Sequence, residues 1–476
     1  MKPHTQTLFL SIGIAFIVFL GAVILSLNQW KRSENSFKKQ KETDKRLTII
    51  ELTNLKRSQP DLTYEEYLSL ASSIYNISKE EIKVLLKVAD INKEDDFNLA
   101  MQYYANNDYQ NAYSTFNKLI SPSYSLEIRA ISYSYLGSIK FRQLKEYTPE
   151  TLGYFLNAKE LFEIINSKES YILQTKANNY YDIALLSKFL GHNQKSEESY
   201  RNAILTYKEI NFEGNYNLEL GMVFNDFYIL SKQYKLEKSP IYYLNKAIKY
   251  KALALDDDPS IFNLRIYLNS INAKANYFVK ARDYKAGINE FKSGLDKINT
   301  IVQITPSNEQ YKLIKSKFLS QFAELYLQKA LDPKYHSGND IVSAEKKLNL
   351  ALESIENISF ADPVDLLTES IVYYDLGSMN RLKGDYRESF RYFTKCLEIR
   401  KDLVQNHQGH IDFLSQMAGV QFEIARLFSE NSNMKNCKNV LEYGEQAKQN
   451  YLITKKFIQR DNHWYKEIIK IMDDCR

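Results

Sequence analysis

Helix-breaking residues are scarce in this chain. Its 476 residues include only 9 Pro and 15 Gly, far below ordinary usage. Because Pro and Gly are the residues that most often interrupt a helix, their scarcity favours long helices with few breaks. The 36 Tyr and 25 Phe provide large side chains that can fill the spaces between such helices.

Motifs of known enzymes are missing as well. The sequence has no GxxxxGK loop followed by Ser or Thr to hold phosphate, no GxSxG turn to present a serine and no HExxH pair to bind zinc. His407 and His410 are the one close pair among the 6 His, and a metal site would need further ligands near them. We therefore predict a protein that is not an enzyme and uses no cofactor or metal. An enzyme with an unfamiliar site is the alternative.

A regular spacing of small and large residues is present. In "YYDLGSMNRLKGDYRESFRYFTKCLE", residues 373–398, Ser389 and Phe393 follow Gly377 by 12 and 16 positions. Gly384 lies between Gly377 and Ser389 and can adopt the positive φ of a tight turn. The pattern predicts two closely packed helices, with Phe393 filling the space beside Gly377.

The same spacing returns along the chain. Two of the matches need an insertion of nine residues before the second helix, so that Phe162 is expected beside Gly137 as Phe393 is beside Gly377. Tyr228 is a poor match because its side chain is large. The patterns start at Ala100, Gly137, Ala184, Tyr228, Ala275, Ala323, Gly377 and Ala425. Successive starts are 37 to 54 residues apart. We therefore predict one structural unit repeated about eight times; a helical bundle with small residues at chance crossings is the alternative.

This pattern resembles the tetratricopeptide repeat (TPR), a helix-turn-helix unit of about 34 residues. The longer spacing leaves a relative of that repeat as an alternative to a strict member. The resemblance implies an all-α, right-handed α-solenoid of about eight helix pairs at residues 93–450, with a capping helix at residues 451–476. In that family the first helix of each pair lines a concave groove that binds proteins or peptides.

Candidate binding residues follow from the groove that the resemblance implies. On each first helix, we expect residues near the small starting residue to project into the groove. An Asn amide there offers both a donor and an acceptor to the backbone of an extended peptide. The candidates are Asn225, Asn269, Asn272, Asn276, Gln321 and Glu324. The alternative is that they are ordinary solvated helix residues.

The amino terminus contains a long apolar stretch. After a short tail at residues 1–7, residues 8–27 carry no charge, which is enough to cross a bilayer as a helix. We predict a retained transmembrane helix, with Trp30 and Lys31 as an interfacial anchor. A cleaved signal peptide is the alternative, although its apolar core would usually be shorter.

The charge beside this stretch is positive. Residues 1–46 hold the whole net charge of +5, and the rest of the chain is neutral. We predict a basic juxtamembrane stalk at residues 28–59, whose cations contact anionic lipid head groups. These lipid-facing cations are Lys31, Arg32, Lys38, Lys39 and Lys41. The neutral remainder argues against a nucleic-acid partner, which would need a basic surface.

A short helical hairpin is expected at residues 60–92, between the stalk and the repeats. Thr63 with Glu66, and Ser78 with Glu81, both match the capping box that begins a helix. The expected role of the hairpin is to cover the first repeat, and a separate docking module is the alternative.

Location is predicted from the charge and from the cysteines. The basic residues that follow the apolar stretch favour a single-pass membrane protein with a cytoplasmic repeat domain. Cys396 and Cys437 fall at core positions of the repeats, and Cys475 is the penultimate residue, so we expect free thiols and no disulfide framework. We predict a membrane-tethered scaffold or adaptor. The alternative is a translocated assembly or secretion factor that faces the periplasm or another exterior compartment.

Overall fold

The structure is a computed structural model. It describes residues 49, 52–53, 55–57, 63–75, 79, 82–83, 96–210, 216–335, 337–355, 358, 363–407, 410–430, 436–455 and 462–476. The predicted transmembrane helix at residues 8–27 lies outside these residues, as do the predicted lipid-facing cations Lys31, Arg32, Lys38, Lys39 and Lys41. Among the helices that the structure does describe, none has the length and apolarity needed to span a bilayer.

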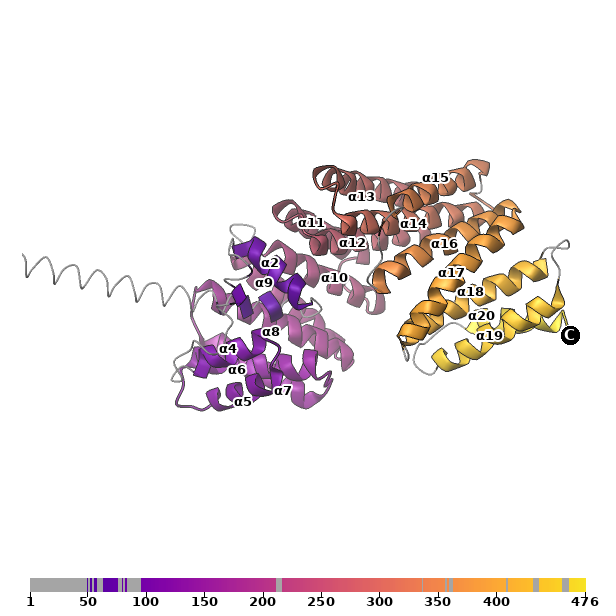
Figure 1. Ribbon diagram of the computed structural model, residues 1–476. Helices are drawn as coiled ribbons and strands as arrows, with labels where there is room; N and C mark the ends of the chain where they lie inside the picture. Colours follow the sequence, from indigo (N-terminus) through magenta and orange to yellow (C-terminus); the bar gives the residue numbers. More distant parts are fainter. Residues whose placement is uncertain are drawn as a thin grey trace, which may run out of the picture. The chain divides into compact units, whose positions relative to one another are not determined.

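The chain is all-α in its described part and divides into two compact units, Met1–Pro240 and Ile241–Arg476. We call them unit 1 and unit 2 (Figure 1). Unit 1 contains α2 (Tyr64–Tyr75), α4 (Asp96–Ala105), α5 (Tyr109–Leu119), α6 (Leu126–Ser138), α7 (Pro149–Ile164), α8 (Ser170–Phe189), α9 (Asn193–Ile210) and α10 (Asn217–Gln233). The division falls in the repeat that starts at Tyr228, the poorest match to the sequence pattern.

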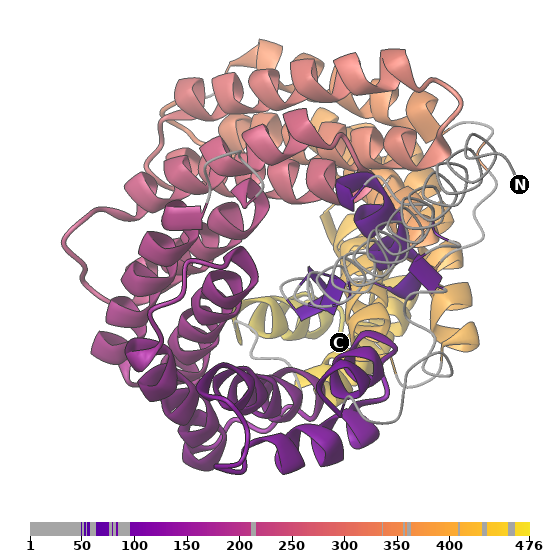
Figure 2. The same ribbon diagram turned by 90° about the vertical axis from the view of Figure 1, so that its left-hand side faces the viewer.

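Unit 2 contains the remaining helices. They are α11 (Pro240–Asp257), α12 (Ile261–Lys280), α13 (Tyr284–Ile304), α14 (Glu309–Leu331), α15 (Gly338–Ile355), α16 (Pro363–Lys383), α17 (Tyr386–Asn406), α18 (Ile411–Glu430), α19 (Cys437–Lys455) and α20 (Asn462–Asp473). Within unit 1, α4 packs with α5, α6 with α7 and α8 with α9, and within unit 2 the same holds for α12 with α13, α14 with α15, α16 with α17 and α18 with α19 (violet to magenta in unit 1 and rose to yellow in unit 2, Figure 2). The predicted fold of paired helices in a TPR-like solenoid is confirmed.

The packing of α16 on α17 explains the spacing around Gly377. A Cβ atom on Gly377 would lie 2.6 Å from the ring of Phe393, which is too close, and Phe393 is fully buried. Ser389 Oγ donates a 2.8 Å hydrogen bond to the carbonyl of Gly377. Ser196 bonds to Ala184 in the same way across α8 and α9. The small residue thus permits close approach, and the residue 12 positions later uses it.

The repeat that starts at Gly137 differs from the prediction. The sequence pattern placed Phe162 beside this glycine, but a Cβ atom on Gly137 would meet the ring of Phe155 at 2.7 Å. The cause is the connection between α6 and α7, because α6 continues into a π-helical segment, Ile139–Gln143, before α7 begins. This segment shifts the register of α7, and Phe162 is buried in the core of unit 1 instead.

Several of the turns within pairs contain a residue with positive φ. Gly191 and Gly384 have φ of 78° and 80°, as the sequence predicted for Gly384. Asn107 and Arg282 take the same positive φ without glycine. In three of these turns the next residue is an aspartate that caps the second helix, because its side chain accepts from a backbone N–H three positions later. These aspartates are Asp108, Asp283 and Asp385.

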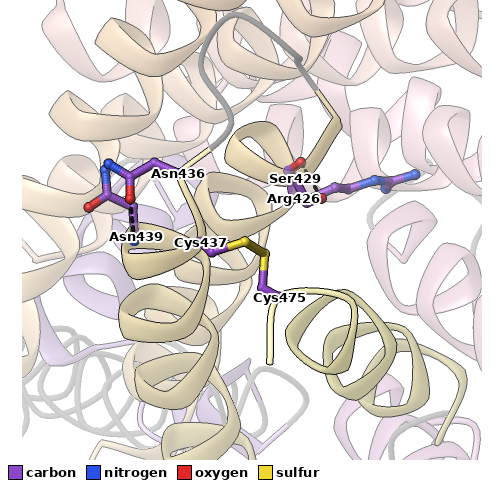
Figure 3. The surroundings of a disulfide bond; sticks show 6 residues. All are labelled: Arg426, Ser429, Asn436, Cys437, Asn439 and Cys475. Carbon is purple, nitrogen blue, oxygen red and sulfur yellow. Dashed lines mark hydrogen bonds between the residues drawn. A yellow bond between two sulfur atoms is a disulfide. The ribbon is translucent and has the colours of Figure 1, made fainter.

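The carboxyl-terminal helix α20 packs against α18 and α19. Ile468 and Met472 are buried, and Met472 lies against Gly444 of α19. The end of α20 thereby lies beside the beginning of α19, and Cys475 forms a disulfide with Cys437, with Cα atoms 5.1 Å apart (Figure 3).

The predicted absence of disulfides is therefore wrong for this pair of cysteines. Cys437 is half-buried instead of a core residue. The two thiols are 38 residues apart in sequence, and only the antiparallel return of α20 brings them together. Cys396 is free and fully buried, as expected, and burial raises the pKa of its thiol to about 12.

Candidate functional site

A pocket lies on the first helices of three successive pairs in unit 2. Helix α14 packs against both α12 and α16, and the cavity between side chains of these helices measures about 110 Å³. Apolar lining comes from Leu268, Leu313, Ile314 and Phe318. The polar lining comes from Arg265, Asn269, Gln310, Lys317, Gln321, Asp365 and Thr368. The pocket thus combines an apolar wall with amides and charges of both signs.

The charged residues that line the pocket are Arg265, Lys317 and Asp365. Gln310 Nε2 donates to Asp365 Oδ2 at 2.9 Å, which joins α14 to α16. Partial desolvation of its amine by the pocket walls and the positive charge of Arg265 lower the pKa of Lys317 below its usual 10.5. Lys317 has no ion-pair partner among the residues that the structure describes. An anionic group brought into this pocket would relieve the repulsion between the two cations.

Two of the predicted peptide-binding residues, Asn269 and Gln321, line this pocket. Asn272 and Asn276 lie further along α12, where Asn276 Nδ2 donates to Asn272 Oδ1 at 3.2 Å. Glu324 lies on the exposed surface of α14 and accepts from Gln328, also on α14. The sixth predicted residue, Asn225, belongs to α10 in unit 1. The structure therefore gathers two of the six candidates at one place.

The residues that the sequence reading missed lie nearer the starts of the first helices. Lys317 stands six positions before the small residue of its repeat, as the predicted residue Asn269 does in its own, and Arg265 stands ten positions before Ala275. The sequence reading looked mainly at positions three before and one after the small residue. At one of these, Ser320 is fully buried and donates its hydroxyl to Asp375 of α16. No cation recurs at these two positions, since Asn269 and Leu313 stand there in the neighbouring repeats, so no repeated pattern pointed to Lys317 and Arg265.

Asp375, the acceptor in this contact with Ser320, has a raised pKa. Its pKa is raised from 3.8 to about 7, mainly by burial and also by the negative charge of Glu324. The hydrogen bond from Ser320 and the charge of Arg400 act in the opposite direction. Asp375 joins α14 to α16 beside the pocket without lining it.

Unit 1 holds a buried polar cluster on its own first helices. Arg57 is fully buried, and its Nη2 donates to Ser134 Oγ on α6 at 2.8 Å and to Asp182 Oδ2 on α8 at 2.9 Å. Arg142, in the π-helical segment after α6, donates through Nε to the other oxygen of Asp182 at 2.8 Å. One carboxylate is therefore shared by two guanidinium groups.

Further groups order this cluster. The Arg57 guanidinium lies 4.8 Å from the centre of the Tyr135 ring, a cation–π arrangement. Ser134 Oγ donates to Asn179 Oδ1 at 2.8 Å, and Asn179 Nδ2 donates to the carbonyl of Phe155 at 2.9 Å. The hydrogen-bond chain fixes the acceptors that face Arg57.

Metal ligands do not gather in the described part of the chain, where no group of three His, Cys, Asp or Glu side chains could hold an ion. His407 and His410 pack their rings against Phe413. This aromatic contact accounts for the one close pair of histidines.

The comparisons with known proteins concern the fold. No protein-family model and no curated protein match the chain. The apo form of the quorum sensor NprR from B. thuringiensis is 12% identical, with a TM-score of 0.39 over 83% of this chain and 99% of that chain. The S. pombe nuclear import adaptor Nro1 is 12% identical, with a TM-score of 0.33 over 74% and 99%. A monomeric mutant of IFIT1 with Gppp-AAAA is 14% identical, with a TM-score of 0.32 over 84% and 94%.

Proposed function

Because the chain is a TPR-like helical repeat protein, we propose that it is a non-catalytic scaffold that binds a protein or an extended peptide on the first helices of unit 2. The observation that carries this proposal is the pocket shared by α12, α14 and α16. Its apolar wall can contact one side chain of a peptide, and its amides can form hydrogen bonds with the peptide backbone. Lys317 and Arg265 favour a ligand with a carboxylate at this point.

The membrane part of the proposal rests on the sequence. The uncharged residues 8–27 and the basic residues that follow them would tether the scaffold to a bilayer, so that the bound partner is held near its surface. The partner would then be a protein that acts at or near that membrane.

Peptide binding can be tested with synthetic peptides. An array of extended peptides with and without an acidic residue would be probed with the full-length chain in detergent, and the strongest binder measured by fluorescence anisotropy. We expect Lys317→Ala to weaken binding at least about 10-fold, because it removes a charge-assisted contact. The double variant Asn269→Ala/Gln321→Ala should weaken it similarly.

Gln328→Ala is the matched control, because Gln328 is an amide on the same helix α14 outside the pocket. It should bind like the wild-type chain. Binding that is the same in the pocket variants and in the control would refute the unit 2 site.

The disulfide favours the second candidate function, an exported assembly or secretion factor. Disulfides persist mainly in oxidising compartments such as the periplasm or the extracellular space, and Cys437 and Cys475 form one here. The test is a reporter, active on one side of the membrane only, fused after Arg476, together with thiol labelling of cells before lysis. An exterior reporter and protected thiols support export, whereas a cytoplasmic reporter and reduced thiols support the adaptor.

A further inference from the structure

A helical segment from the amino-terminal region lies buried in unit 1. Ile49, Leu52, Thr53, Lys56 and Arg57 have helical backbone, and each is at most 4% exposed. They succeed one another at the three-four spacing of a single helix face, and Leu55, beside that face, is buried as well. This is the spacing with which an amphipathic helix enters a groove. The described residues at the end of the predicted stalk are therefore buried against the protein.

The segment contacts first helices of three successive pairs. Ile49 belongs to the core cluster that contains Met101 of α4. Thr53 Oγ1 donates to the carbonyl of Ile49 at 2.7 Å and lies 3.3 Å from the carbonyl oxygen of Met101. Arg57 bonds to α6 through Ser134 and to α8 through Asp182. The segment thus occupies in unit 1 the face that, in unit 2, carries the pocket.

Helix α2, which follows the segment in the chain, also contacts it. Helix α2 begins with a capping box, in which Thr63 Oγ1 accepts from the Glu66 backbone N–H at 3.2 Å and Glu66 Oε2 accepts from the Thr63 backbone N–H at 3.0 Å. This confirms the box that the sequence predicted there. Tyr67 of α2 donates its hydroxyl to the carbonyl of Leu52 at 3.1 Å.

The carboxylate that binds Arg57 has a second cationic partner and does not need Arg57 for its neutralisation. Asp182 remains paired with Arg142 if Arg57 leaves, so withdrawal of the segment leaves no unpaired carboxylate in unit 1. Arg57 itself keeps two unsatisfied donors, because its Nε and Nη1 have no hydrogen-bond partner among the described residues. A buried guanidinium with unmet donors is held more weakly than a fully bonded one. The acceptor site is therefore preformed, and its occupant is exchangeable.

We propose that this face of unit 1 is a binding site for an arginine-bearing helical peptide, and that the segment with Ile49, Thr53 and Arg57 is its intramolecular occupant. Asp182 and Ser134 accept from the guanidinium, and Tyr135 stacks on it. The segment keeps the site closed, and its withdrawal opens the site to an arginine-bearing helix of a partner. This site is separate from the unit 2 pocket and does not rest on the function proposed for it.

The test uses a labelled synthetic peptide of residues 47–59 and the full-length chain. We expect the peptide to bind the Arg57→Ala chain at least about 10-fold more tightly than the wild-type chain, whose own segment competes. A peptide with Arg57→Ala should bind that chain at least about 10-fold more weakly than the native peptide does. A peptide with Arg57→Lys keeps the charge but lacks the planar fork, and it should fall between the two.

The receiving residue is tested by Asp182→Asn in the Arg57→Ala chain, which should lose binding of the native peptide. Equal binding to the wild-type and Arg57→Ala chains, or binding that ignores the arginine of the peptide, would overturn the proposal. Hydrogen exchange of the wild-type chain gives a second test that needs no variant. Amides of residues 49–57 should exchange faster than those of α6 and α8. If the segment, α6 and α8 exchange only at one common rate, the segment is a permanent part of the core, and this result would also overturn the proposal.

Discussion

Units 1 and 2 are built from the same helix pairs, and they differ in what lies on their first helices. In unit 1 these helices carry a buried cluster around Asp182, covered by a segment of the chain itself. In unit 2 they carry an open pocket with the exposed side chains of Asn269 and Lys317. The repeat supplies the same face in both places, and the side chains at a few positions decide whether that face is closed from within or left for a ligand.

The largest expected effect is the loss of Asp182. Asp182→Ala leaves Arg57 and Arg142 buried without their shared carboxylate, so we expect the free energy of unfolding to fall by about 3–5 kcal/mol. Lys317→Ala in unit 2 should change it by less than about 0.5 kcal/mol, because Lys317 is exposed. Urea denaturation followed by circular dichroism measures both. Equal free energies of unfolding for the two variants would contradict the proposed difference between the covered face of unit 1 and the open face of unit 2.

The disulfide distinguishes unit 2 next. It closes a loop of 38 residues, for which the chain-entropy model gives about 4 kcal/mol. Cys437→Ser should lower the stability of unit 2 by up to this amount and leave the amides of unit 1 with unchanged hydrogen exchange. Reductant should bring the wild-type chain to the same stability as the variant, and a wild-type chain indifferent to reductant would contradict the prediction.

Close helix contacts are expected to behave alike in both units. Gly137→Ala and Gly377→Ala place a Cβ atom within 2.7 Å of a buried phenylalanine ring, and each should cost about 1–3 kcal/mol of stability. The matched controls are Gly153→Ala and Gly419→Ala, also within helices, where a Cβ atom meets nothing within 4 Å. These should stabilise by about 0.5–1 kcal/mol. Melting temperatures that move in the same direction for both kinds of glycine would show that the close approach is not what fixes these positions.

The smallest effect concerns the pH dependence of unit 2. The folded state raises the pKa of Asp375 from 3.8 to about 7, so between these values it binds more protons than the unfolded state. This contribution to stability is therefore fully present below about pH 4 and is lost as the pH rises through about 7. Asp375→Asn should make unit 2 about 1–2 kcal/mol more stable at pH 8 and little changed at pH 4. Melting temperatures across this range test it, and a pH-independent difference would exclude Asp375 as the cause.

Much of the fold follows from local patterns in the sequence. The spacing of Gly377, Ser389 and Phe393 predicts a close helix pair because each position depends only on the helical period and on side-chain size. The capping box at Thr63 is equally local. The register of α7 was mispredicted because it depends on a π-helical segment that has no strong sequence signal, so Phe155 and not Phe162 lies against Gly137.

The sites were harder to predict. Asn269 and Gln321 were found because they lie on first helices, but Lys317 was missed because its neighbours in the pocket come from three helices. Nothing in the local pattern shows that Arg57, in a segment that reads as a charged stalk, is buried against residues 77 and 125 positions away.

By itself the sequence determined the helices, their turns and their pairing, because helical periodicity, glycine and side-chain volume act over a few residues. The tertiary structure alone decided three further features: the disulfide between Cys437 and Cys475, the covered face of unit 1 and the open pocket of unit 2. Each of these depends on which distant side chains meet. Such meetings follow from the accumulated geometry of successive helix pairs, to which every connection contributes, and no local pattern of residues encodes that sum.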